Sequence, residues 1–485
     1  IYIKEMKKMI LAAVAASMAL AATAAKPALR IYGDKDRPDT VTRSTYYLIG
    51  ITEPGAQAWI DGKEAHVYNT GSFGAEIKLK DGKNTIPVKV KTAKGTNTVK
   101  RTVVLTEPKP AKAAEVRHDV IYDTPRYALT DSGAYLQYGN GDDRLGGSKM
   151  GFLDEGIGLV LEGENGSLYK VRLAENKFAY VPKSYVHEGE FDPAVVNSGS
   201  ATLSNAGKCD RLSVGLPRRV AYSSVTEIEP QVLKVSLYGV TNNTNWLVRK
   251  GTPGIVGFVD IHQDADVMTF YIRLKDKNNW GYSIYYRGNT LVIDVRHRPA
   301  SLALRDLTIG LDAGHGGKYP GARSPSGLLE KDVNLDIVLK AADILRSKGA
   351  KVVLTRDGDT GPEMSERKRI WKEAGVDLAV SVHNNSSGNP LVPMGTSVYY
   401  KHIFNFGLAE AIHSSMLSLG LVDFGLTGNF NFSLNGPTDY PNALVEGLFM
   451  SSLPEEEMLA DPDFRLRMAE KIVAGIEAYL SQAGN

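Results

Sequence analysis

The chain contains 485 residues, a length that suits about three or four domains of ordinary size. Apolar residues make up 43% of it, which is usual for globular proteins and argues against extensive disorder. Lys and Arg number 57 against 55 Asp and Glu, so the charge balance gives no reason to expect nucleic acid or an anionic membrane surface as the main partner.

The first 25 residues are typical of an export signal. Lys4, Lys7 and Lys8 form a basic start, the apolar stretch MILAAVAASMALAA follows, and small residues that suit cleavage end near Ala25. The apolar stretch is mostly alanine and falls short of the ~20 residues that span a bilayer. We therefore expect an exported protein of the periplasm or cell envelope with no membrane span after signal removal. Because Cys209 is the single cysteine, an internal disulfide is excluded.

Residues 26–300 have the pattern of β structure. Short apolar and β-branched runs alternate with glycine turns such as DG, TG and KG. The segment EPKPAKAAEVR interrupts this pattern, and its content of proline, alanine and lysine predicts a linker. The expected organisation is a β sandwich at 26–107, a linker at 108–117, a small β barrel at 118–187 and a third β domain at 188–300.

After residue 305 the sequence predicts an α/β domain that extends to residue 485. Apolar β-like runs are expected as strands at 307–312, 351–356, 377–383, 396–400 and 442–447. Helical spacing of apolar residues predicts helices at 331–349, 365–375, 406–420 and 464–480. Strands that alternate with helices indicate a largely parallel twisted sheet. The predicted fold class is therefore a multidomain chain with N-terminal β modules and a C-terminal α/β domain.

Three of the predicted strands end in residues able to do chemistry. They end at His315, His383 and Glu446, and Glu330 stands where the first helix begins. In open α/β sheets the working site lies beyond the carboxyl ends of the strands. Two imidazoles and one carboxylate, here His315, Glu330 and His383, are a ligand set of catalytic zinc that keeps a fourth position for water. Glu446 would then move the proton, and the glycines around His315 would let the loop turn tightly.

Other kinds of site have weaker support in the sequence. The GGK segment at 316–318 lacks the first glycine and the Ser or Thr of a phosphate-binding loop. A serine or cysteine nucleophile is unsupported, because the α/β part has no G-x-S-x-G motif and Cys209 lies in the β region. His402 and His413 do not end a predicted strand, and we interpret both as structural.

The motifs LDAGHGG, GLLEKDVNL, VLTRDGD, SERKRI, SVHNN and ALVEGLFMS resemble, in this order, the signature of the zinc-dependent N-acetylmuramoyl-L-alanine amidases of the type-3 amidase family. The resemblance covers about residues 305–485. It implies that Zn²⁺ is bound by His315, Glu330 and His383 and that Glu446 is the catalytic glutamate. The implied reaction is hydrolysis of the amide between N-acetylmuramic acid and the L-alanine of the peptidoglycan stem peptide.

The β region resembles envelope modules. Residues 26–107 resemble an immunoglobulin-like sandwich, residues 118–187 a Src-homology-3-like barrel, and residues 209–299, within the domain at 188–300, an AMIN-type wall-targeting module. The expected partner is peptidoglycan, and the sequence leaves open whether an activator protein is needed. Two alternatives also remain open: an inactive wall-binding scaffold, and a zinc peptidase that cuts within the stem peptide.

Overall fold

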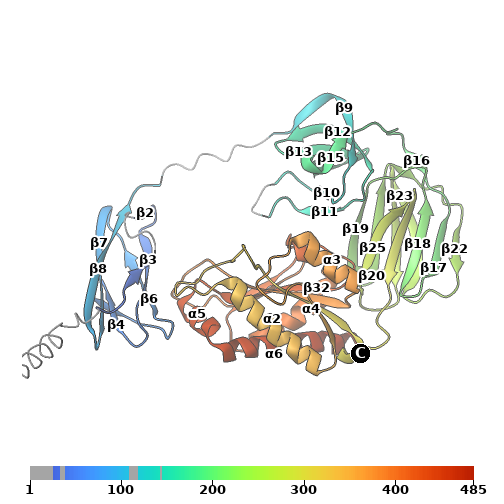
Figure 1. Cartoon of the computed structure of the whole chain (residues 1–485). Helices are drawn as coiled ribbons and strands as arrows, with labels where there is room; N and C mark the ends of the chain where they lie inside the picture. The colour runs from blue at the N-terminus through green and yellow to red at the C-terminus, as the bar shows by residue number, and fades with distance from the viewer. Residues whose placement is uncertain (1–25, 33–38, 109–117, 142–144, 485) are drawn as a thin grey trace, which may run out of the picture.

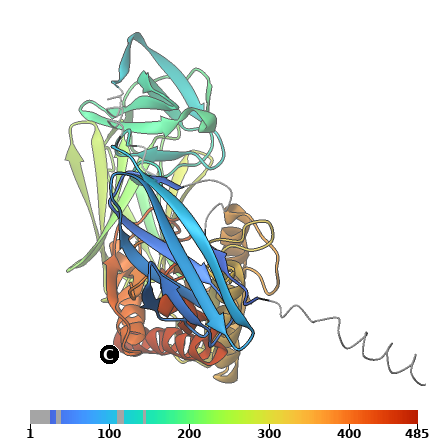
Figure 2. The same cartoon turned by 90° about the vertical axis from the view of Figure 1, so that its left-hand side faces the viewer.

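The computed structural model describes residues 26–32, 39–108, 118–141 and 145–484. Figures 1 and 2 show an N-terminal β module beside one end of the α/β domain, and further β modules against its other end. The predicted export signal and most of the predicted linker lie outside the described residues. None of the described helices is long and apolar enough to cross a membrane.

Two sheets form the N-terminal sandwich. Their strand orders are β1-β3-β6 and β2-β8-β7-β4-β5. The strands are β1 (Arg30–Ile31), β2 (Asp39–Val41), β3 (Thr45–Ile51), β4 (Gln57–Ile60), β5 (Lys63–Ala65), β6 (Ser72–Lys78), β7 (Gly82–Thr92) and β8 (Gly95–Leu105). Alternate residues of β7 are buried, as a period of two requires, and they contribute to a core that belongs to this sandwich alone.

The next module is a seven-stranded antiparallel sheet with the order β11-β10-β14-β13-β12-β9-β15. Its strands are β9 (Val120–Thr130), β10 (Tyr135–Gln137), β11 (Lys149–Phe152), β12 (Gly158–Asn165), β13 (Leu168–Ala174), β14 (Lys177–Pro182) and β15 (Val186–Glu188). A short 3₁₀ helix, η1 (Lys183–Tyr185), joins the last two strands.

The third β module contains a five-stranded sheet (β22-β17-β18-β26-β25), a four-stranded sheet (β19-β20-β24-β23) and the strand pair β16-β21. Its strands are β16 (Val196–Asn197), β17 (Ala201–Asn205), β18 (Cys209–Gly215), β19 (Tyr222–Ile228), β20 (Gln231–Tyr238), β21 (Val240–Thr241), β22 (Leu247–Lys250), β23 (Val256–Asp264), β24 (Val267–Leu274), β25 (Tyr282–Arg287) and β26 (Thr290–Arg296). The buried residues of both larger sheets belong to one core.

The catalytic domain is built on a six-stranded sheet with the order β28-β27-β29-β32-β30-β31. Its strands are β27 (Thr308–Ala313), β28 (Lys351–Leu354), β29 (Leu378–Asn385), β30 (Thr396–Tyr399), β31 (Asp423–Thr427) and β32 (Asn442–Phe449). The central strand β32 is buried along its whole length, because helices or neighbouring modules cover both faces of the sheet.

The sheet is mixed. β30 runs antiparallel to β32, whereas the other four neighbouring pairs are parallel. A parallel connection needs a crossover of a dozen or more residues, usually a helix. The segment between β29 and β30, residues 386–395, contains no helix, so the chain returns in the opposite direction. The alternation of strand and α-helix fails at this connection and again between β31 and β32, where residues 428–441 contain only the 3₁₀ turn η4 (Ser433–Asn435).

Helices cover both faces of the sheet. They are α2 (Glu330–Ser347), α3 (Met364–Ala374), α4 (Phe406–Leu417), α5 (Leu453–Ala460) and α6 (Pro462–Gly484), with the 3₁₀ turns η2 (Leu304–Asp306), η3 (Ile403–Asn405) and η4 (Ser433–Asn435). α2 and α4 pack against α6 and share one face, whereas Trp371 of α3 packs on Gly310 from the other. The sequence did not predict β31 and α5, because their apolar residues are interrupted.

The second β module (strands β9 to β15, the barrel-like module below), the third β module and the C-terminal α/β domain share one continuous apolar core. Trp280 is 1% exposed, and its ring centroid lies 5.9 Å from that of Tyr479 on α6. Tyr282 of β25 likewise packs against Phe404 of η3. These two ring contacts join the third β module to the C-terminal α/β domain.

Candidate metal centre

Three side chains from separate segments meet at the carboxyl edge of the catalytic sheet. His315 follows β27, Glu330 is the first residue of α2, and His383 lies near the end of β29. One ligand atom from each of them lies within 4.8 Å of the other two. Among the described residues, no other group of three or more His, Cys, Asp or Glu has this spacing.

Glu330 is the centre of this group. Its Oε1 lies 3.1 Å from His315 Nε2 and 3.1 Å from His383 Nδ1, and its Oε2 accepts a hydrogen bond from the Ala322 amide at 2.8 Å. Burial opposes ionisation, but the hydrogen bonds with the two imidazoles hold the pKa of Glu330 well below its ordinary value. The side chain is therefore an ionised carboxylate with only 4% of its surface exposed, which suits a bound cation.

Two buried asparagines fix the position of Glu330. Asn334, one helical turn further along α2, donates to Glu330 Oε1 and to the Gly314 carbonyl, each at 3.2 Å. Asn384 donates to Asn334 Oδ1 at 2.8 Å, and its backbone amide donates to Glu330 at 3.3 Å. The sequence analysis assigned no role to either residue. The usable signals were the position of Asn384 directly after His383 and that of Asn334 four residues after Glu330.

The glycines near His315 make room for the other members of the group. A Cβ on Gly314 would lie 2.3 Å from the His383 ring, and one on Gly321 would lie 2.4 Å from Glu330 Oε2. His315 itself has a φ of 63°, which a side chain rarely adopts. The sequence predicts that these glycines let the loop turn tightly, and the structure adds that Gly314 and Gly321 make room for the candidate ligands.

A buried arginine holds the backbone of the His315 loop from behind. Arg367 of α3 is 1% exposed and donates to Asp312 Oδ1 at 2.5 Å, to the Ala313 carbonyl at 2.9 Å and to the His315 carbonyl at 2.7 Å. Although burial raises the pKa of Asp312, the charge of Arg367 lowers it below its ordinary value. This ion pair connects α3 to the strand end that presents His315. Arg367 lies within the SERKRI motif, but the sequence alone predicts no role for it.

Glu446 lies next to His383 on the adjacent strand. β29 and β32 are parallel, and their register pairs His383 with Glu446. Glu446 is 8% exposed. Burial lowers the pKa of His383, but the hydrogen bond with Glu330 and the negative charge of Glu446 raise it above its ordinary value. The structure therefore brings together all four residues that the sequence analysis selected.

Aromatic side chains border the group on the side of residues 430–432. The Phe432 ring stacks on His383 with centroids 6.4 Å apart and an angle of 24° between the rings. Phe430 and Tyr399 pack edge-on or tilted against Phe432. An apolar wall beside charged groups excludes water and strengthens their electrostatic interactions.

The other histidines considered as ligands lie elsewhere. His413 is buried in α4 with its Nε2 3.0 Å from Asp423 Oδ1, and His402 Nε2 lies 3.0 Å from the Gly436 carbonyl. Neither belongs to the group of His315, Glu330 and His383, called the metal-type group below.

Comparison with known proteins places this site in a family. A family model described as N-acetylmuramoyl-L-alanine amidase matches residues 309–478. The germination-specific N-acetylmuramoyl-L-alanine amidase of Bacillus subtilis is 29% identical over 204 residues, which are 39% of this chain and 86% of that protein. An uncharacterized protein of the same organism, YqiI, is 31% identical over 188 residues, which are 38% of this chain and 89% of the relative.

A solved structure gives the same match. The N-acetylmuramoyl-L-alanine amidase AmiC2 of Nostoc punctiforme is 35% identical, with a TM-score of 0.35, and the alignment covers 36% of this chain and 97% of that chain. A His–Glu–His group at the edge of a mixed α/β sheet is the kind of site that metal-dependent hydrolases use. The chain belongs to the N-acetylmuramoyl-L-alanine amidase family.

Proposed function

We propose that the chain hydrolyses the amide bond between N-acetylmuramic acid and the L-alanine of the peptidoglycan stem peptide. Family membership supports this reaction class. The observation that carries the proposal is the convergence of His315, Glu330 and His383 with Glu446 at the neighbouring register position. Together these residues offer a cation site and a separate carboxylate at the same edge of the sheet.

The donor set fits zinc. Two imidazole nitrogens and one ionised carboxylate are a common ligand set of catalytic zinc, and it keeps a position for water or substrate. When bound, such an ion lowers the pKa of a water molecule and polarises the carbonyl under attack. His315, Glu330 and His383 would hold it, while Asn334 and Asn384 keep the carboxylate in place.

Glu446 is the proposed proton carrier. Its carboxylate takes a proton from the attacking water and delivers it to the amide nitrogen, which leaves as the amine of L-alanine. The position of Glu446 beside His383, with 8% of its surface exposed, supports this role. Arg367 contributes indirectly by holding the His315 carbonyl, so it is a positioning residue.

The β modules at 26–107, 118–187 and 188–300 are the proposed cell-wall anchors of an exported enzyme. A binding module on the same chain raises the effective concentration of the catalytic domain at an insoluble substrate. Exposed aromatic residues on these modules, among them Trp246 and Phe258, are available for such contacts.

Mass analysis of the fragments released from purified peptidoglycan tests the reaction. An amidase releases peptides that begin with L-alanine and leaves glycan with free lactyl groups. Cleavage within the stem would instead identify a peptidase, and an absence of products with zinc-loaded protein would identify a scaffold.

Metal content tests the proposed ligands. His383→Ala should reduce zinc below one equivalent and lower thermal stability, because a metal that binds only the folded state adds to its stability. His187→Ala, at an exposed position of β15, is the matched control and should keep its zinc. Full zinc occupancy in His383→Ala would remove His383 from the ligand set.

The role of Glu446 has its own test. Glu446→Gln keeps the shape of the side chain but cannot shuttle a proton, so turnover per zinc-loaded molecule should fall by about 10²- to 10⁴-fold. Zinc content and melting temperature should stay close to those of the unmodified protein. Near-normal turnover in Glu446→Gln would show that another group carries the proton.

A further inference from the structure

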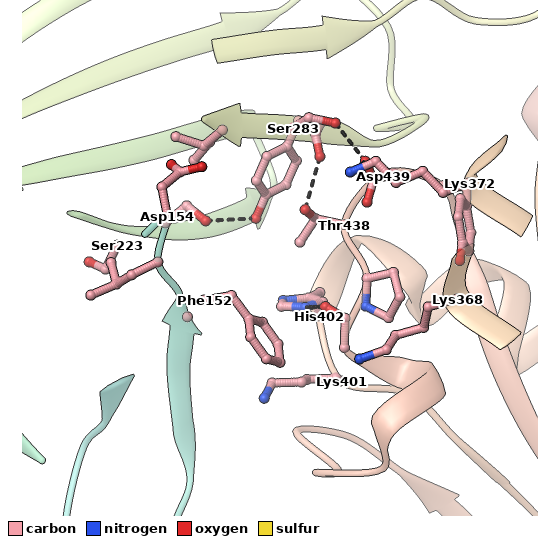
Figure 3. Close-up of a pocket in the computed structure, with 18 of the residues that line it drawn as sticks. Phe152, Asp154, Ser223, Ser283, Lys368, Lys372, Lys401, His402, Thr438 and Asp439 are labelled. Atoms are coloured by element: carbon pink, nitrogen blue, oxygen red, sulfur yellow. Dashed lines mark hydrogen bonds and ion pairs between the residues drawn. The ribbon is translucent and has the colours of Figure 1, made fainter. Parts of the chain in front are cut away.

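A cavity lies where the barrel-like module, the third β module and the catalytic domain meet. Its volume is about 450 Å³, within the ~300–1,000 Å³ range of small-ligand sites. Figure 3 shows its wall, which is formed by the end of β11, by β19 and β25 of the third β module, and by α3 and the loops at 401–402 and 433–440 of the catalytic domain. The cavity is thus distinct from the metal-type group but borders the same catalytic domain.

Two carboxylates of this cavity already have partners. Asp154 accepts hydrogen bonds from the Tyr222 hydroxyl at 3.1 Å and from the Tyr286 amide at 3.2 Å. Asp439 accepts one from Ser283 at 2.7 Å and lies 3.3 Å from the Lys372 ammonium. Among the described residues, neither carboxylate forms an ion pair with Lys368 or Lys401.

Lys368 and Lys401 provide uncompensated positive charge. In the part of the chain that the structure describes, no carboxylate lies within 4.0 Å of either ammonium group, and Lys401 donates to the neutral Asn431 Oδ1 at 2.8 Å. Burial and the nearby charge of Lys149 lower the pKa of Lys401 to about 8 and also lower that of Lys368. Like charges brought together out of water are unfavourable unless an anion joins them.

The geometry around these lysines suits a planar anion next to an apolar surface. Figure 3 shows Lys368 and Lys401 on the same side of the cavity, close to Phe152. The Lys368 ammonium lies 5.5 Å from the centroid of the Phe152 ring. Two ammonium groups can each donate to one oxygen of a carboxylate, which forms strong charge-assisted hydrogen bonds.

The cavity is connected to the metal centre through one short segment. Phe432 stacks on His383, whereas its neighbour Asn431 contacts Lys401 and its other neighbour, Ser433, lines the cavity. Asn431 also donates to the Gly147 carbonyl of the barrel-like module at 2.7 Å. Residues 431–433 therefore border both the cavity and the group at His383.

We propose that the cavity binds a carboxylate of the peptidoglycan stem peptide, held between Lys368 and Lys401, while the scissile amide lies at the metal centre. The proposal rests on the proposed amidase function and names the part of the substrate that determines affinity. Because β11 and β25 form part of the wall, the β modules contribute directly to the substrate site.

The test uses the full chain and two synthetic muramoyl peptides that differ only at the end of the stem, one a free acid and the other a carboxamide. The unmodified enzyme should have a KM for the acid about 10- to 100-fold lower than for the carboxamide. The double variant Lys368→Gln/Lys401→Gln should lose this difference while kcat changes less than twofold. The control Lys351→Gln/Lys471→Gln, with both substitutions remote from the cavity, should keep it.

Several outcomes would overturn the proposal. Equal KM values for the two peptides in the unmodified enzyme, or a preference for the acid that survives in the double variant, would each do so. If inorganic phosphate binds in a way that needs both lysines while the two peptides bind equally, the cavity serves a phosphate-bearing polymer. If neither peptide is hydrolysed, the proposed function fails, and calorimetric binding of the acid against the carboxamide still decides the role of the cavity.

Discussion

The N-terminal sandwich and the β modules of residues 118–300 contact the same catalytic domain in different ways. The sandwich has a core of its own and meets the catalytic domain mainly at α5, through hydrogen bonds and through the packing of Gly74 beside Leu391 and Leu453. The other two modules have no separate core, since their buried residues continue into the catalytic domain. Figure 1 shows the sandwich and the third β module at opposite ends of the domain.

The polar contact depends on one buried carboxylate. Glu456 of α5 is fully buried and accepts hydrogen bonds from the Ser72 hydroxyl at 2.5 Å and from the Ser326 amide at 2.6 Å. Ser72 belongs to the sandwich, and Ser326 to the loop that leads into Glu330 of the metal-type group. The sandwich therefore docks next to the candidate active site without sharing its core.

This difference suggests how each attachment responds to change. Residues within one apolar core unfold together, because a cavity in the core removes packing contacts from all the elements that line it. A module with its own core can unfold or detach separately, and its attachment is as strong as a few hydrogen bonds. Three experiments test this distinction, and we take them in order of expected effect.

The largest effect is expected from cavities in the two cores. Trp280→Ala and Phe73→Ala each remove a fully buried ring and should each cost about 3–5 kcal/mol. Trp280→Ala should lower the unfolding midpoints of the third β module and the catalytic domain together, whereas Phe73→Ala should lower that of the sandwich alone. Urea unfolding followed by hydrogen exchange measures both. Separate transitions within residues 118–484 of Trp280→Ala would contradict the shared core.

An intermediate effect of pH is expected at the shared interface. Burial lowers the pKa of His402 to about 4, so below pH 6.5 the unfolded chain binds a proton that the folded chain does not. Stability should therefore fall by about 1–3 kcal/mol as the pH drops from 6.5 to 4. Comparison of urea unfolding at pH 7 and pH 4.5 measures this loss. His402→Asn should lose less stability between pH 7 and pH 4.5 than the unmodified protein. The control His187→Gln, at an exposed site, should lose as much as the unmodified protein. An equal loss in His402→Asn would exclude His402 as the cause.

The smallest effect is expected at the polar contact. Glu456→Gln removes the negative charge that strengthens the hydrogen bonds from Ser72 and Ser326, which should weaken docking of the sandwich by about 1–3 kcal/mol. Hydrogen exchange should increase at residues 68–72 and 324–328 and stay unchanged in β27 and β29. Glu457→Gln, which affects the single contact with the Asn69 amide, should change exchange less. Unfolding of the whole catalytic domain in Glu456→Gln would show that this contact is part of the shared core.

The sequence predicted most elements of the catalytic domain because their apolar periods are long and regular. The helices at α2, α4 and α6 follow a 3.6-residue period, and β27 and β29 are continuous apolar runs between turn residues. β31 and α5 were missed because their apolar residues are interrupted, by Gly425 in the strand DFGLT and by three consecutive glutamates in the helix LPEEEMLA. The antiparallel direction of β30 was missed as well, because direction depends on where a chain reverses in space.

The candidate site illustrates the same division. His315, His383 and Glu446 could be selected from the sequence because the end of a strand is a local feature, and parallel strands bring such ends to one edge. The roles of Asn334, Asn384 and Arg367 depend on hydrogen bonds between residues up to 55 positions apart along the chain, the largest separation being that between Arg367 and Asp312. Local patterns carry no information about such partners.

What the sequence determined by itself is therefore local: the order of β and α/β regions, the elements with a clear period, and the four chemically capable residues at strand and helix ends. Only the tertiary structure decided that Gly314 and Gly321 make room for His383 and Glu330, and that the sandwich keeps its own core while the other β modules share one. It also decided that Lys368 and Lys401 meet in a cavity. The physical reason is that periodicity and turn chemistry act between neighbours in the chain, whereas packing, charge and space act between neighbours in the fold.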